Sequence, residues 1–321
     1  MRRNAPLGPC PALPRSTTSS RSAERAAPAP SVRAGPMGRK DADQPLPADA
    51  EPPRPARSME ARMPYKSILV FLDATSDTSG RLDLAITLAQ QHAARVLGVD
   101  VSTPAALEGQ WKDEATGLQD LFQSRLDHAH LIGEFRVADR STSSWKALYA
   151  HFADLVVATQ RHESNAGLVL PAVPEDVLLS AGVPVLILPP GWRPKPVGQS
   201  IVLAWTPSRE ATRAAHDALP LLTRAQRVTL FEFAPPADSL DFAPNLMVDH
   251  LRQHGVESEL FTWRDKGDSS PVDALFSCLD RQEADLVVAG AYGHSRLIEG
   301  LFGGVSADLI RNVSMPVLMS H

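Results

Sequence analysis

The sequence predicts an α/β protein whose parallel β-sheets are covered by helices on both faces. Short runs of apolar, often β-branched residues alternate with longer stretches in which apolar residues recur at helical spacing. These runs are apolar throughout instead of alternating with polar residues, which is typical of strands buried on both faces. The same pattern occurs twice along the chain, which indicates two similar domains.

The elements of the first copy follow one another with short polar turns between them. A polar cluster, Ala74 to Asp77, separates the first strand from the first helix, and the prolines and glycines between Pro189 and Gly198 end the copy. The expected strands are SILVFLD (67–73), RVLGVDV (95–101), EFRVA (134–138), DLVVAT (154–159) and VPVLILP (183–189). The expected helices are LDLAITLAQQHA (82–93), a region ending near Ile132, and a helix around WKALYAHF (145–152).

Three segments of the first copy return in the second copy in the same order. SIVLAW repeats SILVFL, ADLVVAG repeats ADLVVAT and SMPVLMS repeats GVPVLIL, at offsets of 200 − 67 = 133, 284 − 153 = 131 and 314 − 182 = 132. A nearly constant offset predicts a duplicated domain, with copies at 63–192 and 199–321 and a linker at 193–198. We expect a pseudo-two-fold axis between the copies, with the closing strands VPVLIL and MPVLM near it, because like edges meet in symmetric pairs.

Residues 1–62 differ from the rest of the chain. They contain twelve of the 28 prolines and no aromatic residue, so we expect a disordered tail that forms no core. Its Arg- and Ser-rich composition weakly resembles a transit peptide, and no apolar stretch of a secretory signal follows Met1. A start assigned too early, with Met59 or Met63 as the true one, is the alternative.

Charge and cysteine content restrict the partners and the compartment. Without the tail the chain has 32 − 11 = 21 basic and 37 − 6 = 31 acidic residues, a net charge of −10. Such a surface is a poor match for nucleic acid or an anionic membrane, and no apolar run reaches the roughly 18 residues of a membrane span. The two cysteines, Cys10 and Cys278, favour a reducing cytoplasm over a disulfide framework, and Cys278 is expected to be buried in a helix.

Four features together resemble the universal stress protein family. They are a strand followed by Asp73-Ala74-Thr75, the ADLVV segment, a G-x2-G-x9-G loop in GAYGHSRLIEGLFGG (290–304) and a closing PVL strand. The resemblance covers about 65–321. It implies two tandem flavodoxin-like domains, each a five-stranded parallel sheet with helices on both faces, that pair within the chain and leave a homodimer open. It also implies a role in stress adaptation through binding or protein interaction.

The resemblance further implies an adenine nucleotide, with ATP as the expected ligand, on the second copy. Ligands of open parallel sheets sit beyond the carboxyl ends of the strands. Glycines allow positive φ and close backbone approach, and the helix VSADLIRN (305–312) could direct its first amides at an anion. The loop histidine could donate to a phosphate or simply be exposed. The expected site residues are Thr206, Gly290, Gly293, His294, Gly303, Gly304 and Val305.

Each copy lacks part of the family's pattern. A hydroxyl residue is expected where the second copy has Gly304, and an Asp is expected where it has Thr206, whereas the first copy keeps that acid as Asp73 but has no glycine loop. Two alternatives therefore stay open: a pair of domains without a small ligand, and a weak ATP-hydrolysing enzyme. Because the second copy lacks an acid to hold Mg²⁺, and no Walker A or G-x-S-x-G motif occurs, we expect no enzyme beyond trace ATPase activity.

Two further patterns carry weaker signals. His250 and His254 are spaced i, i+4, as in two-histidine metal sites, but no H-E-x-x-H motif and no third ligand nearby in sequence accompany them. We therefore expect surface histidines and no metal site. Trp205 ends the first strand of the second copy and is expected in the core or in a pocket wall.

Overall fold

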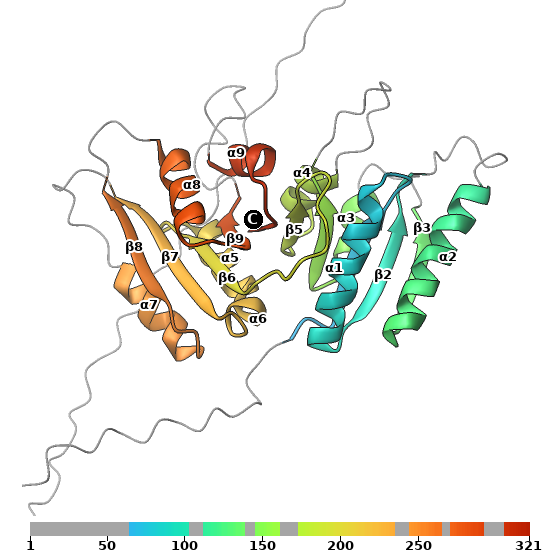
Figure 1. Cartoon of the computed structure of the whole chain (residues 1–321), viewed down its shortest axis with the longest axis horizontal. Helices are drawn as coiled ribbons and strands as arrows, with labels where there is room; N and C mark the ends of the chain where they lie inside the picture. Colours follow the sequence, from blue (N-terminus) through green and yellow to red (C-terminus); the bar gives the residue numbers. More distant parts are fainter. Residues whose placement is uncertain are drawn as a thin grey trace, which may run out of the picture. The chain divides into compact units, whose positions relative to one another are not determined.

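The computed structural model describes residues 64–102, 112–138, 145–160, 173–234, 244–264, 270–291 and 305–321 (Figure 1). The predicted tail lies outside these residues, and so do Gly293, His294, Gly303 and Gly304 of the glycine loop. Strands and helices alternate along the described residues, so the predicted α/β class is confirmed. None of the helices described there is long and apolar enough to cross a membrane.

We call residues 64–192 the first half and residues 199–321 the second half. In the first half the elements are β1 (Ser67–Leu72), α1 (Asp77–His92), β2 (Arg95–Asp100), α2 (Lys112–Ala129), β3 (Gly133–Val137), α3 (Trp145–Ala150), β4 (Leu155–Thr159), α4 (Val173–Ser180) and β5 (Val185–Leu188). In the second half they are β6 (Ser200–Ala204), α5 (Arg209–Asp217), α6 (Leu219–Leu222), β7 (Arg227–Ala234), α7 (Pro244–Gln253), β8 (Glu259–Arg264), α8 (Pro271–Arg281), β9 (Leu286–Gly290), α9 (Val305–Asn312) and β10 (Val317–Ser320).

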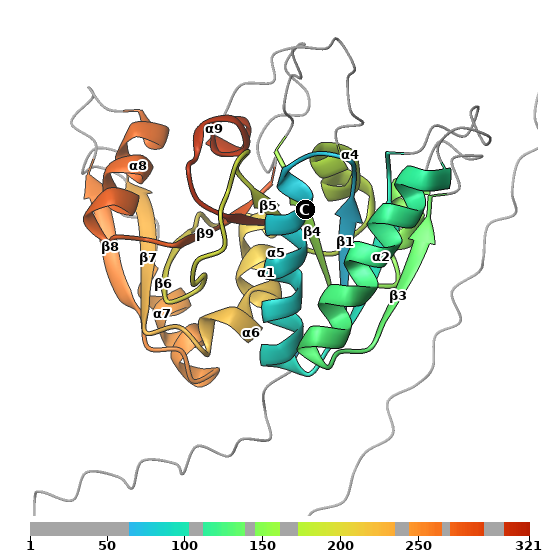
Figure 2. The same cartoon turned by 45° about the vertical axis from the view of Figure 1, so that its right-hand side comes forward.

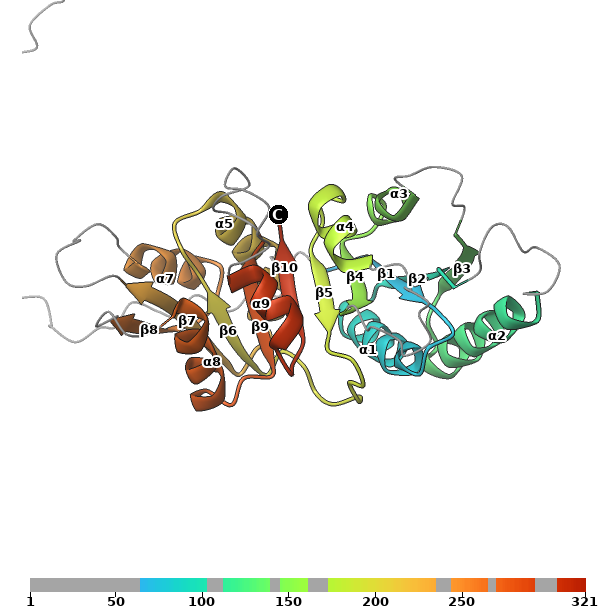
Figure 3. The same cartoon turned by 90° about the horizontal axis from the view of Figure 1, so that it is seen from above.

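The strands of the described residues form one ten-stranded sheet in the order β3-β2-β1-β4-β5-β10-β9-β6-β7-β8 (Figure 3). Neighbouring strands within each half are parallel, whereas β5 and β10 pair antiparallel. From its outer edge inward, each half therefore runs third, second, first, fourth and fifth strand. The direction of strand addition reverses between β1 and β4 and between β6 and β9, which are the switch points of the two halves.

The flavodoxin-like strand order that the resemblance implied is wrong. That order, 2-1-3-4-5, places the third strand in the middle of the sheet, whereas β3 and β8 are the two outer edges here. The sequence of β3 explains the difference, because Glu134 and Arg136 are exposed on it and charged side chains suit an edge strand. Each half follows the order 3-2-1-4-5 that begins the doubly wound dinucleotide-binding fold.

Helices cover both faces of the sheet, which explains why every residue of β1 is buried (Figures 2 and 3). Successive side chains of a strand point to opposite faces. Ile68, Val70 and Leu72 accordingly belong to the core under α1, α2, α5 and α7. Leu69 and Phe71 belong to the core under α3, α4, α8 and α9. The continuous apolar strands of the sequence are therefore strands buried on both faces.

The closing strands meet where the halves join, as predicted. Leu186 of β5 lies opposite Leu318 of β10 in the antiparallel register. These two residues are also equivalent in the internal repeat, because 318 − 186 = 132 is the offset of their segments. A local two-fold relation therefore passes between them. Arg213 of α5 strengthens the contact by donating from Nη2 to the Gly182 carbonyl of the other half at 2.8 Å.

The aspartate of each ADLVVA segment holds the start of the neighbouring strand. Asp154 Oδ2 accepts hydrogen bonds from the backbone N–H groups of Lys66 and Ser67, at 2.7 and 2.9 Å. Asp285 Oδ1 accepts from Gly198 N at 2.8 Å and Ser200 N at 3.3 Å, at the end of the predicted linker. The repeated acid therefore has a structural role, since it satisfies backbone donors that precede the sheet ladder.

Candidate functional site

The switch point of the second half brings together three of the residues predicted for the site. Thr206 follows the end of β6 and is exposed, Gly290 is the last residue of β9 and Val305 is the first residue of α9. Ser306 Oγ donates to the Gly290 carbonyl at 3.3 Å, so the amino end of α9 lies against the end of β9. The remaining predicted residues, between 292 and 304, lie outside the described residues.

The structure gives Gly290 a packing role that the sequence did not reveal. A Cβ at this position would lie 2.4 Å from Ala211 N and 2.6 Å from Glu210 C, which are backbone atoms in the first turn of α5. Gly290 is not one of the described glycines with positive φ, so the predicted left-handed backbone is not its reason. The close approach that the glycine permits is that of a helix of the same half.

The first turn of α5 lies at this same edge because of its cap. Ser208 is in the extended conformation, and its Oγ accepts from Ala211 N at 3.1 Å, which is the geometry of an N-cap. Trp205, one residue after β6, is only 6% exposed and packs in the core. Of the two predicted positions, core or pocket wall, the structure shows the core. This edge therefore holds the exposed Thr206 and two helix amino ends, those of α5 and α9.

The switch point of the first half is filled by a side chain that sequence reasoning missed. Arg81 of α1 is 4% exposed. Its Nη2 pairs with Asp73 Oδ1 at 3.0 Å, just beyond β1, and its Nη1 donates to Thr159 Oγ1 at 2.8 Å, at the end of β4. The guanidinium thus bridges the two strand ends between which ligands of such sheets bind.

Asp73 is held by its own half. Its Oδ1 also accepts from Thr75 N at 3.0 Å, from the Thr75 hydroxyl and from Thr78 Oγ1 at 2.9 Å. Burial raises the pKa of Asp73, but the Arg81 guanidinium and the Thr75 and Thr78 hydrogen bonds outweigh it and leave the pKa below its ordinary value of 3.8. The acid that the resemblance assigned to a nucleotide is therefore committed to an internal ion pair.

A comparison of the two copies could have found this arginine. The first-strand offset of 133 makes Ala214 the counterpart of Arg81 and Thr206 the counterpart of Asp73. The aspartate and the arginine are thus both present in the first copy and both missing from the second. Such a joint change is the sequence signal of a pair in contact.

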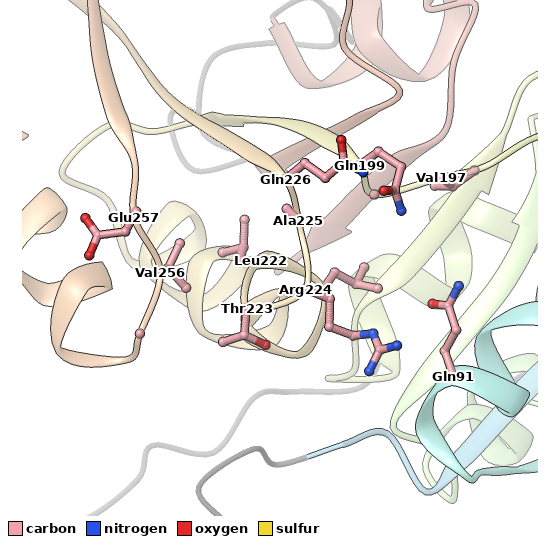
Figure 4. Close-up of a pocket in the computed structure, with 13 residues that line it drawn as sticks. Gln91, Val197, Gln199, Leu222, Thr223, Arg224, Ala225, Gln226, Val256 and Glu257 are labelled. Atoms are coloured by element: carbon pink, nitrogen blue, oxygen red, sulfur yellow. The ribbon is translucent and has the colours of Figure 1, made fainter. Parts of the chain in front are cut away.

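A hollow of about 420 Å³ lies elsewhere on the second half (Figure 4). Its walls come from the segments that precede β6, β7 and β8, so it lies at the amino-terminal edge of the sheet. Arg224, Gln199 and Gln226 supply polar groups, and Gln91 approaches from α1. Because ligands of open parallel sheets bind at the opposite edge, the hollow is not the predicted site.

Cys278 is fully buried in α8, as predicted. Burial raises the pKa of its thiol to about 11, so the reactive thiolate is disfavoured at neutral pH. The residue packs with the core under α8 and α9. It acts there as a small apolar side chain.

Comparisons with known proteins bear on the second half and on the fold. A family model described as "Universal stress protein family" matches residues 199–321. The curated universal stress proteins Rv1636 and MT1672, from two strains of Mycobacterium tuberculosis, are each 40% identical over 52 residues. That match covers 16% of this chain and 36% of the length of these relatives.

Two solved structures share the fold over most of the chain. A universal stress protein from Archaeoglobus fulgidus superposes with a TM-score of 0.62 at 15% identity, over 79% of this chain and 95% of the other. A putative universal stress protein from Pseudomonas aeruginosa does so with a TM-score of 0.52 at 16% identity, over 80% of this chain and 93% of the other. At such identities the likeness concerns the fold alone. Residues 199–321 of this chain contain a domain of the universal stress protein family.

Proposed function

We propose that the chain is a tandem universal stress-type protein, with domains at 63–192 and 199–321 joined by residues 193–198, that acts in stress adaptation in the cytoplasm. Binding of a ligand or of a partner protein is its activity. The identical strand order of the two halves and the fold shared with universal stress proteins support the tandem arrangement. Pairing of the domains is intramolecular, so a homodimer would have to use a surface other than β5 and β10.

We propose further that an adenine nucleotide, with ATP as the first candidate, binds at the switch point of the second half. The observation that carries this is the position of α9, whose amino end is held at the end of β9 by Ser306 and Gly290. A helix amino end favours a phosphate there. Thr206 is exposed between the end of β6 and the start of α5. Ala214 stands where the first half has Arg81, the arginine that fills the switch point of that half.

Calorimetric titration with ATP tests this proposal. Gly304→Ser restores the hydroxyl expected by resemblance and should tighten binding twofold to tenfold, which is about one neutral hydrogen bond of roughly 0.5–1.5 kcal/mol. Gly293→Val should abolish binding while the circular dichroism spectrum stays unchanged, because it blocks backbone approach. Absence of heat with both the wild type and Gly304→Ser at millimolar ATP would overturn the nucleotide proposal.

The same edge supports a binding role over catalysis. Thr206 stands where an acid could hold Mg²⁺, and Asp73, the corresponding acid of the first half, is paired with Arg81. We therefore expect at most trace ATP hydrolysis by the purified protein. Steady turnover that a substitution between 290 and 304 abolishes would favour the weak enzyme instead.

A second candidate function, protein interaction without a small ligand, is favoured by Gly290. Its close contact with α5 explains this first glycine of the loop without any phosphate. Native mass spectrometry of protein purified from its own cells separates the two candidates. A co-purifying nucleotide supports the first, and a bound protein without nucleotide supports the second.

A further inference from the structure

Three histidines from two segments that are far apart in sequence gather on the surface of the second half. His216 lies in the last turn of α5, His250 in the last turn of α7 and His254 just beyond that helix. Nε2 of His216 and Nε2 of His250 are 3.0 Å apart. The ring centroid of His250 lies 5.1 Å from that of His216 and 4.7 Å from that of His254. The i, i+4 pair of the sequence therefore acquires the third histidine that it lacked.

The spacing of the first two rings is close to that of metal ligands. With metal–nitrogen distances of about 2.0–2.1 Å and tetrahedral angles, two ligand nitrogens lie about 3.3–3.4 Å apart. The observed 3.0 Å between His216 Nε2 and His250 Nε2 needs an opening of only a few tenths of an ångström. Two nitrogens facing each other in this way have one proton at most between them, so the pair is neutral or singly charged.

The third ring is the part that must move. The centroids of His216 and His254 are 6.4 Å apart, which is wider than about 5.2 Å for two imidazoles on one tetrahedral ion. No group of three or more His, Cys, Asp or Glu side chains in the described part of the chain is already arranged to hold a metal. His254 is exposed and follows the end of α7, so rotation of its side chain meets little resistance.

The acids next to these histidines are engaged with arginines. Asp217 Oδ2 accepts from Arg213 Nε at 2.8 Å, and Asp249 pairs with Arg252. Three neutral imidazoles without a carboxylate suit zinc, copper or nickel and do not suit the oxygen-preferring calcium and magnesium.

We propose that His216, His250 and His254 form a surface site for Zn²⁺ or another divalent ion that prefers imidazole, completed when the His254 ring turns toward the other two. Water fills the remaining positions of the ion. The site joins α5 to α7, so a bound ion ties together two helices of the same face of the sheet. It lies at the carboxyl end of α5, whereas the proposed nucleotide edge lies at the amino end of that helix.

Calorimetric titration of the tag-free, full-length protein with zinc chloride in a non-chelating buffer tests this site. His216→Ala and His254→Ala should each weaken binding at least about tenfold, because even residues that only orient metal ligands are worth 10–100-fold in affinity. His128→Ala is the matched control, since it removes an exposed histidine from α2 and should leave binding unchanged. Cobalt substituted for zinc should give the visible bands of a tetrahedral ion in the wild type and in the control.

These measurements distinguish a metal site from surface histidines that bind no ion. Equal affinity of the wild type and His216→Ala would overturn it, as would absence of zinc binding by the wild type. Since the substituted residues are exposed, circular dichroism spectra of the metal-free variants should match that of the wild type. Zinc should also raise the melting temperature of the wild type and not that of His216→Ala, because a ligand of the native state alone stabilises it.

Discussion

The two switch points of this sheet are packed in different ways. In the first half Arg81 reaches between the ends of β1 and β4 and holds Asp73 and Thr159. In the second half Gly290 replaces a side chain and lets the first turn of α5 rest on the end of β9. Two halves with the same strand order can thus differ at the carboxyl edge of the sheet, where a buried side chain joins two strand ends in the first half and a helix rests on a strand end in the second.

The largest effect that tests this comparison should come from Arg81→Ala. It leaves the Asp73 carboxylate, whose side chain is 14% exposed, without its ion-pair partner. Loss of one partner of a buried pair costs about 3–5 kcal/mol, and the hydrogen bonds from Thr75 and Thr78 place the expected loss at the lower end. Urea denaturation measures it. A double variant, Arg81→Met with Asp73→Asn, should recover much of the loss, and a loss equal to that of the single variant would show that the pair is not the cause.

Gly290→Ala should destabilise the protein by an amount near the upper end of the 1–3 kcal/mol typical of overpacking. The added Cβ meets backbone atoms of α5, which cannot turn away as a side chain can. Gly117→Ala is the matched control, because Gly117 is an exposed position of α2 where a Cβ meets nothing within 4 Å. The control should gain about 0.5–1 kcal/mol from helix propensity. A neutral Gly290→Ala would mean that α5 does not lie so close.

The aspartates of the repeated segments should have matching effects in the two halves. Asp285→Asn and Asp154→Asn keep the shape of the side chain and weaken charge-assisted hydrogen bonds to backbone N–H groups, at a cost of about 1 kcal/mol each. Thermal unfolding of the two variants gives the comparison. A loss of thermal stability in only one variant would show that the aspartate does not have the same role in both halves.

The smallest effect concerns pH and is specific to the first half. Because the folded-state pKa of Asp73 lies below 3.8, its contribution to stability is fully present above the unfolded-state value and is lost as pH falls through the folded-state value. Asp73→Asn should therefore lose less stability than the wild type when pH falls from neutral to below 3.8. Identical acid sensitivity of the two proteins, measured by denaturant titration, would contradict the assignment.

Much of the architecture could be predicted from the sequence, because it follows from periodicity and repetition. The apolar runs gave the strands, and the offset of 132 identified the closing strands that pair through Leu186 and Leu318. The strand order could not be taken from a family label, since it depends on which strand tolerates an edge. The charges of β3 carried that information.

The site was predicted less completely, because its determinants are contacts between distant segments. No local pattern distinguishes the buried Arg81 from a surface arginine of an amphipathic helix. The role of Gly290 depends on how close α5 comes to β9, which spacing along the chain does not reveal. His216 stands 34 residues before His250, and only packing of α5 beside α7 unites them.

Because one chain supplies both β5 and β10, their antiparallel pairing does not depend on protein concentration. Two separate domains would meet through this edge only as often as diffusion brings them together. A short covalent connection instead supplies an effective concentration on the order of millimolar, and both ends of the connection are fastened, Gly191 N to Asp77 at 2.9 Å and Gly198 N to Asp285 at 2.8 Å. Dilution therefore does not separate the halves of one molecule, because the covalent connection keeps them close to each other.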